Sequence, residues 1–340
     1  MPVKPLRVSV VIPTYNRAAL VVRAVASALA ACLAGDEVIV VDDGSTDATP
    51  AALAPYASKI RFVQAPHGGA GATRNRGILE ARNDLVAFLD SDDEWRPDHL
   101  TLHRAVHEGR PDVVVSFSDF SVEDREGRHV PRYLAQWHRD PRPWSEILSP
   151  GVRLSSIAPG SQAAKSAGDV PVHVGDLYTA QLLSDYVAMF TTVAKRNALP
   201  DAKWFAEDVP TFEDLLCAGR LAGAGLAAFL DRETATQHGH ASLRLTNAPP
   251  LSKTDARIKI LERVWGSDPA FLATHADLYR ERMRTQHVLR ARSLLKEGRM
   301  AEARAAIRAA GRAPFAYRLL SWMPGAVARG VGKTVGLVRK

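Results

Sequence analysis

The amino-acid sequence predicts an α/β fold, with a mixed, mostly parallel sheet covered by helices on both faces and a C-terminal α-helical region. Three observations lead to this prediction. Short continuous apolar runs alternate with helical patterns from Arg7 to Leu89, several of these runs end at Pro or Asp, and the segment from Ala256 to Ala310 has helical character throughout. Continuous apolar strands joined by helices are typical of parallel sheets buried on both faces.

The strands and helices of the N-terminal part follow from the spacing of apolar residues. We expect strands at 7–12, 38–41, 60–63 and 85–89, with helices at 18–33, between Asp47 and Pro55, and at 72–82. Polar, Gly-containing or acidic residues follow each strand. Ligands of such sheets bind beyond the carboxyl ends of the strands, so we expect the chemistry along that edge.

The length of 340 residues corresponds to about two domains at roughly 150 residues each. We place one at 1–250, with a first half at 1–118 and a second at 119–250, and a basic helical region at 251–340. Within the second half, residues 120–185 hold several prolines and a Gly/Ser/Ala-rich stretch, which we interpret as a long loop or insertion that determines acceptor specificity.

The net charge of +7 is unevenly distributed. From Lys253 to Lys340 there are 19 Lys/Arg and 7 Asp/Glu, a balance of +12, and apolar and aromatic residues are interleaved with the basic ones between Phe315 and Met323. Such a segment favours an anionic membrane surface, or else forms a solvated basic face over packed helices. No nucleic-acid-binding motif accompanies the charge, so we do not expect a nucleic-acid partner.

The cysteines and the first residues of the sequence indicate the cellular compartment in which the protein is expected. Cys32 and Cys217 are isolated, which excludes a disulfide framework and is typical of buried thiols in a reducing compartment. No signal-peptide pattern precedes the first strand, and no apolar run approaches the ~18 residues of a membrane span. We expect a cytoplasmic protein, either free or in peripheral contact with the inner face of the cytoplasmic membrane.

Four acidic or Gly-rich segments carry the candidate chemistry. Crowded carboxylates in Asp90-Ser91-Asp92-Asp93 suit Mg²⁺ or Mn²⁺ bound together with substrate phosphates, although a solvated acidic turn has the same pattern. Asp42-Asp43-Gly44-Ser45 fits hydrogen bonds to a base or ribose, or an Asx turn. Residues 68–75 allow close backbone approach to a ligand and include Arg74, which can bind phosphate, but they lack the full dinucleotide fingerprint.

The fourth segment is Glu213-Asp214 at the start of an apolar helical run. An acidic pair at this position stabilises a helix N-terminus, and it can also supply a general base that faces an acceptor hydroxyl. The pair Glu207-Asp208 is a rival for that role.

Taken in order, these segments resemble one known family. The residues Val8 to Arg17 (VSVVIPTYNR), Val41 to Asp47 (VDDGSTD), Gly71 to Gly77 (GATRNRG) and Phe88 to Asp93 (FLDSDD) are similar to the family 2 glycosyltransferases of the GT-A fold. The resemblance covers roughly residues 7–245, is thin from 120 to 185, and resumes at Glu213-Asp214.

The resemblance implies an inverting transfer of a sugar from a nucleotide-sugar, commonly a UDP-sugar, to a hydroxyl of a glycan or lipid-linked acceptor in cell-envelope polysaccharide synthesis. It implies a Mg²⁺ or Mn²⁺ cofactor and single additions, since the Gln-x-x-Arg-Trp motif of processive relatives is absent. The implied catalytic residues are Asp214, as base, and Glu213. The implied donor-binding residues are Pro13, Thr14, Tyr15, Asp43, Arg74, Asp90 and Ser91, and the implied metal ligands are Asp92, Asp90 and His240.

Two other classes of protein remain as alternatives. A nucleotidyltransferase could use a similar sheet and metal, but it usually has a Gly-rich basic loop directly after the first strand, where this chain has Pro13 to Arg17. A catalytically inactive binding protein could keep the fold. The presence of Asp90, Asp92 and Asp214 argues against an inactive binding protein.

Overall fold

The computed structural model describes residues 5–161, 163, 169–239 and 248–325 of the chain. It divides into two compact units. Unit 1 comprises 1–207 and 213–242, and unit 2 comprises 208–212 and 243–340. The predicted domain boundary at residue 250 stays a prediction, because compactness alone does not mark where a functional domain ends.

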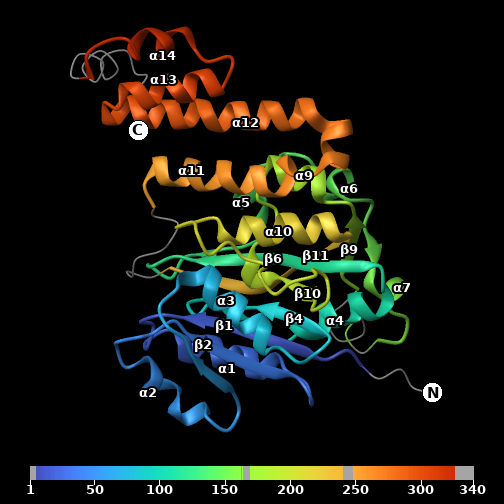
Figure 1. The fold of residues 1–340 in the computed structure, drawn as a ribbon. Coiled ribbons are helices and arrows are strands. Elements are labelled where there is room, and N and C mark those ends of the chain that lie inside the picture. The colour runs from blue at the N-terminus through green and yellow to red at the C-terminus, as the bar shows by residue number, and fades with distance from the viewer. Residues whose placement is uncertain (1–4, 162, 164–168, 240–247, 326–340) are drawn as a thin grey trace. The chain divides into compact units, whose positions relative to one another are not determined.

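Unit 1 is built on one mixed sheet, as predicted (Figure 1). Its strands are, in spatial order, β3 (Arg61–Gln64), β2 (Glu37–Asp42), β1 (Val8–Thr14), β4 (Leu85–Phe88), β10 (Val193–Lys195), β6 (Val113–Glu123), β11 (Leu226–His238), β9 (Pro171–Gly175) and β8 (Val152–Arg153). The first four pair in parallel, and β6 pairs in parallel with β11. The short strands β5 (Glu94–Trp95) and β7 (His129–Val130) pair with β11 and β6, respectively.

Helices lie on both faces of this sheet (Figure 1). On one face, α1 (Val21–Ala31) contacts α4 (His99–Gly109), and on the other α3 (Gly69–Glu80) contacts α10 (Glu213–Ala224). The short helix α2 (Thr49–Leu53) precedes the 3₁₀ turn η1 (Ala54–Tyr56). A Cβ added at Gly77 of α3 would lie 2.2 Å from Val11 Cγ1 of β1, so glycine is what allows α3 to lie this close to the sheet.

The interpretation of residues 120–185 as a long loop was wrong in part. Strand β6 continues to Glu123 and β9 pairs with β11, so this segment contributes to the sheet. Its other elements are short: α5 (Leu134–His138), α6 (Trp144–Ile147), α7 (Leu154–Ile157), α9 (Tyr178–Leu183) and the following 3₁₀ turn η2 (Met189–Thr191). Elements of this length are too short to show a hydrophobic period in the sequence.

Unit 2 is helical, as predicted. It contains α11 (Pro250–Leu261), a π-helical turn η4 (Glu262–Gly266), α12 (Pro269–Glu297), α13 (Met300–Ala309) and α14 (Phe315–Leu320). Gly298 ends α12 with φ 78°, a left-handed conformation that glycine adopts without steric cost, and so forms the predicted hairpin with α13. Across the residues that the model describes, we find no helix both long and apolar enough to span a membrane.

Three histidines of α4 lie in the core at helical spacing. His99, His103 and His107 are at most 2% exposed. His99 Nδ1 lies 2.6 Å from Thr234 Oγ1, while His103 Nδ1 and His107 Nε2 lie 2.7 and 3.0 Å from Ser116 Oγ. Burial lowers the pKa of His99 to about 3 and that of His107 to about 4, and it also lowers the pKa of His103 well below its usual value. All three side chains are therefore neutral in the folded protein at pH 7.

We expect this histidine row to make the fold acid-sensitive. An unfolded histidine binds a proton below about pH 6.5, whereas these three remain neutral in the fold, so stability is full above pH 6.5 and decreases as the pH falls towards 4. Each such histidine contributes up to about 1.4 kcal/mol per pH unit to that loss. In urea unfolding between pH 7.5 and 4.5, His103→Leu should show a shallower pH dependence than the parent. An identical slope in both proteins would contradict the assignment.

Candidate active site

Asn16 fastens the loop after β1 to the loop after β2. It has a left-handed φ of 51°, and its Oδ1 accepts hydrogen bonds from the backbone N–H of Thr46 at 2.8 Å and of Asp47 at 3.3 Å. Its own N–H donates to Ser45 Oγ at 2.9 Å. The sequence analysis missed this role, although Asn is the non-glycine residue that most readily adopts this conformation. The two loops thereby form one edge at the carboxyl ends of the strands.

The buried Asp43 holds the start of α3 at the same edge. Its Oδ1 accepts from Gly68 N–H at 2.8 Å and its Oδ2 from Gly69 N–H at 3.0 Å, and His67 Nδ1 lies 2.9 Å from Oδ2. The His67 ring stacks on the ring of Tyr15, with centroids 4.4 Å apart. Tyr15, 41% exposed, thus presents an aromatic surface beside Asp43. A base-binding role for Asp43 stays a prediction, and His67 is a residue that the sequence analysis did not single out.

Arg74 joins two of the predicted site segments. It is 6% exposed, and its guanidinium donates from Nη1 to Glu213 Oε1 at 2.9 Å and from Nη2 to Asp90 Oδ1 at 2.6 Å. Burial alone would lower the pKa of Arg74, but the neighbouring carboxylates of Asp90 and Glu213 outweigh burial and raise it. The structure therefore brings together α3, the end of β4 and the start of α10 around one permanent positive charge.

A close contact between α3 and the segment before α10 produces this arrangement. A Cβ at Gly71 would lie 2.1 Å from Ala206 O, so no larger residue fits there without a shift of the backbone. Asn75 fixes the same segment, because its Nδ2 donates to Phe205 O and its Oδ1 accepts from Phe205 N–H, both at 2.9 Å. Helix α3 is thereby held against the chain that leads into α10.

Asp214 is the second residue of α10 and is partly exposed. Its Oδ1 accepts from Leu215 N–H at 2.9 Å. Burial, together with the adjacent charge of Glu213, raises the pKa of Asp214 to about 7. A carboxyl group with this pKa can accept a proton at neutral pH and release it again, which is the property that a general base needs.

The rival acidic pair has a different environment. Asp208 forms ion pairs with Arg263 and Lys259, both at 2.5 Å, and these hydrogen bonds hold its pKa far below the usual range. Glu207 Oε1 accepts from Asn75 Nδ2 at 2.8 Å. Asp208 is therefore a weak proton acceptor, and the geometry favours Asp214 over the pair at 207–208.

The predicted metal ligands Asp90 and Asp92 follow β4. Burial raises the pKa of Asp90, with Arg74 acting against it and the charge of Asp92 adding to it. Arg17 Nη2 lies 3.9 Å from Asp92 Oδ2, and Ser91 is buried between the two aspartates. The described residues contain no group of three His, Cys, Asp or Glu side chains placed to hold a metal ion, and His240 lies outside them. The donor set still fits Mg²⁺ or Mn²⁺, because these ions bind through one or two carboxylates plus phosphates and water.

Three of the buried polar atoms that lack a hydrogen-bond partner in the described residues belong to the candidate site. Within the described part of the chain, Thr14 Oγ1, Asp42 Oδ2 and Arg74 Nε are buried and form no hydrogen bond. Thr14 and Asp42 are register partners at the ends of β1 and β2. Pro13 precedes Thr14 in the same strand. Since buried polar groups are nearly always paired in folded proteins, three unpaired ones near the strand ends support a polar ligand there.

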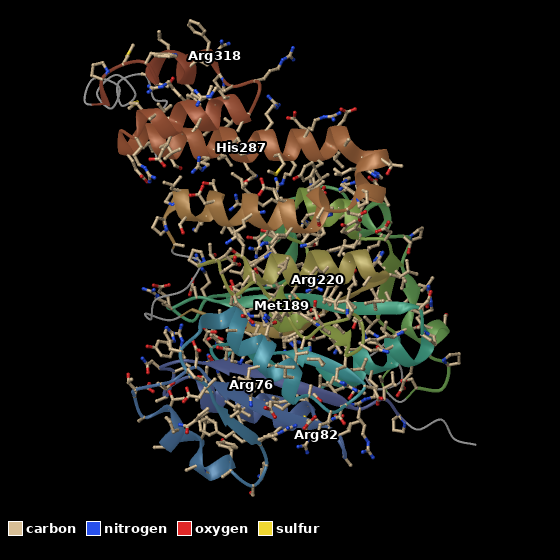
Figure 2. All side chains as sticks on the ribbon, in the orientation of Figure 1. Arg76, Arg82, Met189, Arg220, His287 and Arg318 are labelled. Atoms are coloured by element: carbon tan, nitrogen blue, oxygen red, sulfur yellow. The ribbon has the colours of Figure 1, made fainter. Side chains whose placement is uncertain are left out.

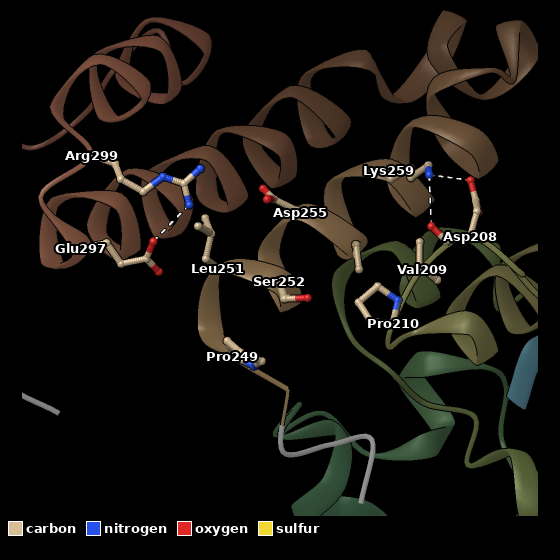
Figure 3. A pocket seen from close by; sticks show the side chains of 11 residues that line it. Asp208, Val209, Pro210, Pro249, Leu251, Ser252, Asp255, Lys259, Glu297 and Arg299 are labelled. Carbon is tan, nitrogen blue, oxygen red and sulfur yellow. Dashed lines mark hydrogen bonds and ion pairs between the residues drawn. The ribbon is translucent and has the colours of Figure 1, made fainter. Parts of the chain in front are cut away.

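A separate hollow of about 450 Å³ lies in unit 2 (Figure 3). Pro210, Pro249 and Leu251 contribute apolar surface to it. Its charged side chains pair with one another, Lys259 with Asp208 and Arg299 with Glu297. These charges already neutralise one another, and of the candidate catalytic residues that the sequence analysis names, the hollow is lined by the rival Asp208.

Solved structures with the same architecture define the class of fold. The S. aureus protein TarS, residues 1–349, in complex with UDP-GlcNAc, superposes with a TM-score of 0.55 over 88% of each chain at 18% identity. The mannosyltransferase PcManGT from Pyrobaculum calidifontis, in complex with GDP-Man and Mn²⁺, gives a TM-score of 0.51 at 20% identity and covers 99% of this chain and 82% of that one. Unit 1 thus has the fold of the GT-A glycosyltransferases, as predicted.

Sequence comparisons find relatives for the N-terminal part of the chain. Residues 9–153 match the model described as glycosyl transferase family 2. The succinoglycan biosynthesis proteins ExoO and ExoW of Rhizobium meliloti (strain 1021) are 41% identical over 122 residues and 42% identical over 101 residues. These segments are 35% and 28% of this chain and only 35% and 32% of the relatives' lengths. Residues 9–153 are therefore similar to the family 2 glycosyltransferases, and the match leaves most of each relative's length uncovered.

Proposed function

We propose that this protein transfers a sugar from a nucleotide-sugar donor to a hydroxyl group of a glycan or lipid-linked acceptor, with inversion at the anomeric carbon. One observation carries the proposal. Arg74 bonds both Asp90, at the metal-binding segment, and Glu213, the neighbour of Asp214, so the groups needed for the donor and for the acceptor converge on one buried cation. The family match over residues 9–153 supports the reaction class.

In the proposed reaction Asp214 accepts the proton of the acceptor hydroxyl. The acceptor oxygen forms a bond to the anomeric carbon while the bond from that carbon to the diphosphate oxygen breaks, and the bonding electrons leave with the nucleoside diphosphate. Arg74 stays protonated throughout and stabilises the negative charge that develops on the leaving diphosphate next to Asp90. Glu213 positions Arg74 and is not free to act as the base.

Asp92 and Asp90 would hold the divalent cation together with the donor phosphates. Mg²⁺ or Mn²⁺ there would neutralise part of the diphosphate charge. The structural neighbour PcManGT was solved with GDP-Man and Mn²⁺, which supports a metal-dependent donor site.

The nucleotide would bind along the edge formed by the loops after β1 and β2. Tyr15, stacked on His67, offers an aromatic face for a base, and Pro13, Thr14 and Asp43 lie at the same strand ends. We favour a uridine diphosphate donor, since the neighbour TarS was solved with UDP-GlcNAc and with UDP. The relatives ExoO and ExoW act in succinoglycan biosynthesis by name, so we propose a surface polysaccharide as the product.

The site of action would be the cytoplasm, at the inner face of the membrane, where lipid-linked acceptors are presented. The basic C-terminal region would provide the contact with anionic lipids. We place the end of the catalytic domain at residue 250, as the sequence analysis predicts.

Thermal denaturation with UDP-, GDP- and dTDP-sugars, each with and without Mn²⁺, tests the donor site. A donor at 100 times its Kd adds about 2.7 kcal/mol to the stability of the folded state and should raise Tm by roughly 5 °C. We expect the rise for one nucleotide only, dependent on Mn²⁺, and lost in Asp92→Asn.

The matched control is Asp201→Asn, which removes an exposed carboxylate paired with Arg220. It should keep the Mn²⁺-dependent shift. No shift with any donor in the parent protein would refute the donor site, and an unchanged shift in Asp92→Asn would refute the metal assignment alone.

A further inference from the structure

Helix α14 of unit 2 has apolar residues on two opposite sides. Its inner side carries Tyr317 and Leu320, which are buried with Leu294 and Ala303 in the small core formed with α12 and α13. Its outer face carries Phe315 and Leu319, 76% and 51% exposed, and is extended by Trp322, 77% exposed, in the turn that follows the helix. The spacing i, i+4, i+7 places these three side chains on one side. The core of unit 2 therefore does not need them.

Among the described residues, arginines without an ion-pair partner occur in α13, in α14 and in the segment between them. Arg308, Arg312 and Arg318 are exposed and form no ion pair with any described residue; Arg318 is labelled on α14 in Figure 2. Arg304 lies 5.0 Å from the centre of the Trp322 ring. Residues 303–325 contain these four arginines and no Asp or Glu.

Other arginines of unit 2 contrast with this group. Arg284, Arg290 and Arg299 each pair with a carboxylate, of Glu281, Asp255 and Glu302, respectively. The positive charge around α14 is thus left uncompensated next to an exposed apolar surface.

We propose that the outer face of α14 docks on the surface of an anionic lipid bilayer. The positive charge and the exposed apolar side chains of this face together favour a lipid bilayer as its partner. The arginines match lipid phosphates, while the Phe, Leu and Trp side chains match the acyl boundary beneath them. A second copy of the chain would bring the unpaired arginines of both copies together, and a nucleic acid would offer no apolar layer for three exposed side chains.

This inference deepens the proposed function and rests on it in one respect, the membrane-held acceptor. It assigns the lipid contact to particular residues. The sequence analysis grouped all apolar residues from Phe315 to Met323, whereas the structure separates the buried Tyr317 and Leu320 from the exposed three.

Vesicle co-sedimentation of the full chain tests the docking surface. Vesicles of phosphatidylcholine with phosphatidylglycerol should bind the protein, vesicles of phosphatidylcholine alone should bind it at least tenfold less, and binding should weaken as salt is raised. The variant Arg308→Gln/Arg312→Gln/Arg318→Gln should bind the anionic vesicles roughly a hundredfold less. The variant Phe315→Ser/Leu319→Ser/Trp322→Ser should also lose binding, and since these side chains are exposed its Tm should match that of the parent.

Two control variants match the chemistry elsewhere on the protein. Leu33→Ser removes a leucine that is 51% exposed, and Arg82→Gln, labelled in Figure 2, removes an exposed charge from unit 1. Both should bind anionic vesicles as the parent does. Equal binding of the parent to neutral and anionic vesicles, or parent-like binding by both triple variants, would overturn the proposal. So would a parent dimer that the serine variant converts to a monomer without any vesicle binding.

The same preparations separate this inference from the proposed function. If the donor-dependent Tm shift is present and vesicle binding is absent, only the docking surface is refuted. If vesicle binding is present and no donor shifts Tm, the donor site is refuted and the lipid contact stands.

Discussion

Asp214→Asn is expected to bind the donor with unchanged affinity and to lose transfer by a factor of about 10²–10⁴, the usual contribution of a general base. The amide is nearly isosteric with the carboxyl group and can still accept the hydrogen bond from Leu215 N–H, so the start of α10 should be preserved. Single-turnover transfer assays, with donor affinity measured separately by thermal shift, distinguish loss of chemistry from loss of binding.

The pH dependence gives a second measure of the same residue. Because burial and Glu213 raise the pKa of Asp214 to about 7, kcat/KM should rise as the pH increases from 6 to 8 and the carboxyl loses its proton. Residual activity of Asp214→Asn should lack this rise. Asp208→Asn, at the rival position, should keep both the rate and the profile, and parent-like turnover in Asp214→Asn would place the base elsewhere.

Arg74→Met should destabilise unit 1 by about 3–5 kcal/mol, the cost of removing one partner from a buried charge network. Without the guanidinium, the carboxylates of Asp90 and Glu213 lose the hydrogen bonds of 2.6 and 2.9 Å and repel each other. Methionine keeps most of the volume, so the loss reports charge and hydrogen bonding rather than a cavity. Urea unfolding at pH 7 measures it.

Arg76→Met is the matched control, two residues along the same helix and labelled in Figure 2. Arg76 is half exposed and pairs with Glu80 at i, i+4, so its loss should cost no more than about 0.5 kcal/mol. The loss of stability in Arg74→Lys should lie between those of Arg74→Met and Arg76→Met, because a single ammonium group cannot hydrogen-bond both carboxylates as the guanidinium group does. A change below about 1 kcal/mol for Arg74→Met would show that the network is not buried in solution.

The sequence predicts the elements that have a strong local pattern. Strands β1, β2 and β4 are continuous apolar runs closed by polar residues, and α12 and α13 flank a glycine turn, so each is visible within a window of the chain. The family motifs allowed Arg74, Asp90 and Asp214 to be nominated. No local pattern carries the contact between Arg74 and Glu213, which are 139 residues apart.

Two residues of the candidate site escaped prediction for different reasons. The residue type of Asn16 favours its left-handed backbone, but nothing in the local sequence indicates its hydrogen bond to Thr46, 30 positions away. His67 owes its place to stacking on Tyr15, a tertiary contact between separate loops. The close approach of Gly71 to Ala206 likewise becomes visible only when both segments are placed in space.

The position of β11 in the sheet has a consequence for how the chain folds. Strands β1 to β4 pair with one another within the first 88 residues, although β4 also pairs with the later strand β10. Strand β6 pairs with β11, whose first residue Leu226 pairs with Val113. Pairings that close such long loops form slowly, so on a ribosome β1 to β4 can pair with one another while the edge of β6 that pairs with β11 is still open. That edge is a site for aggregation until residue 238 has emerged, which makes truncation before β11 a more damaging change than truncation after it.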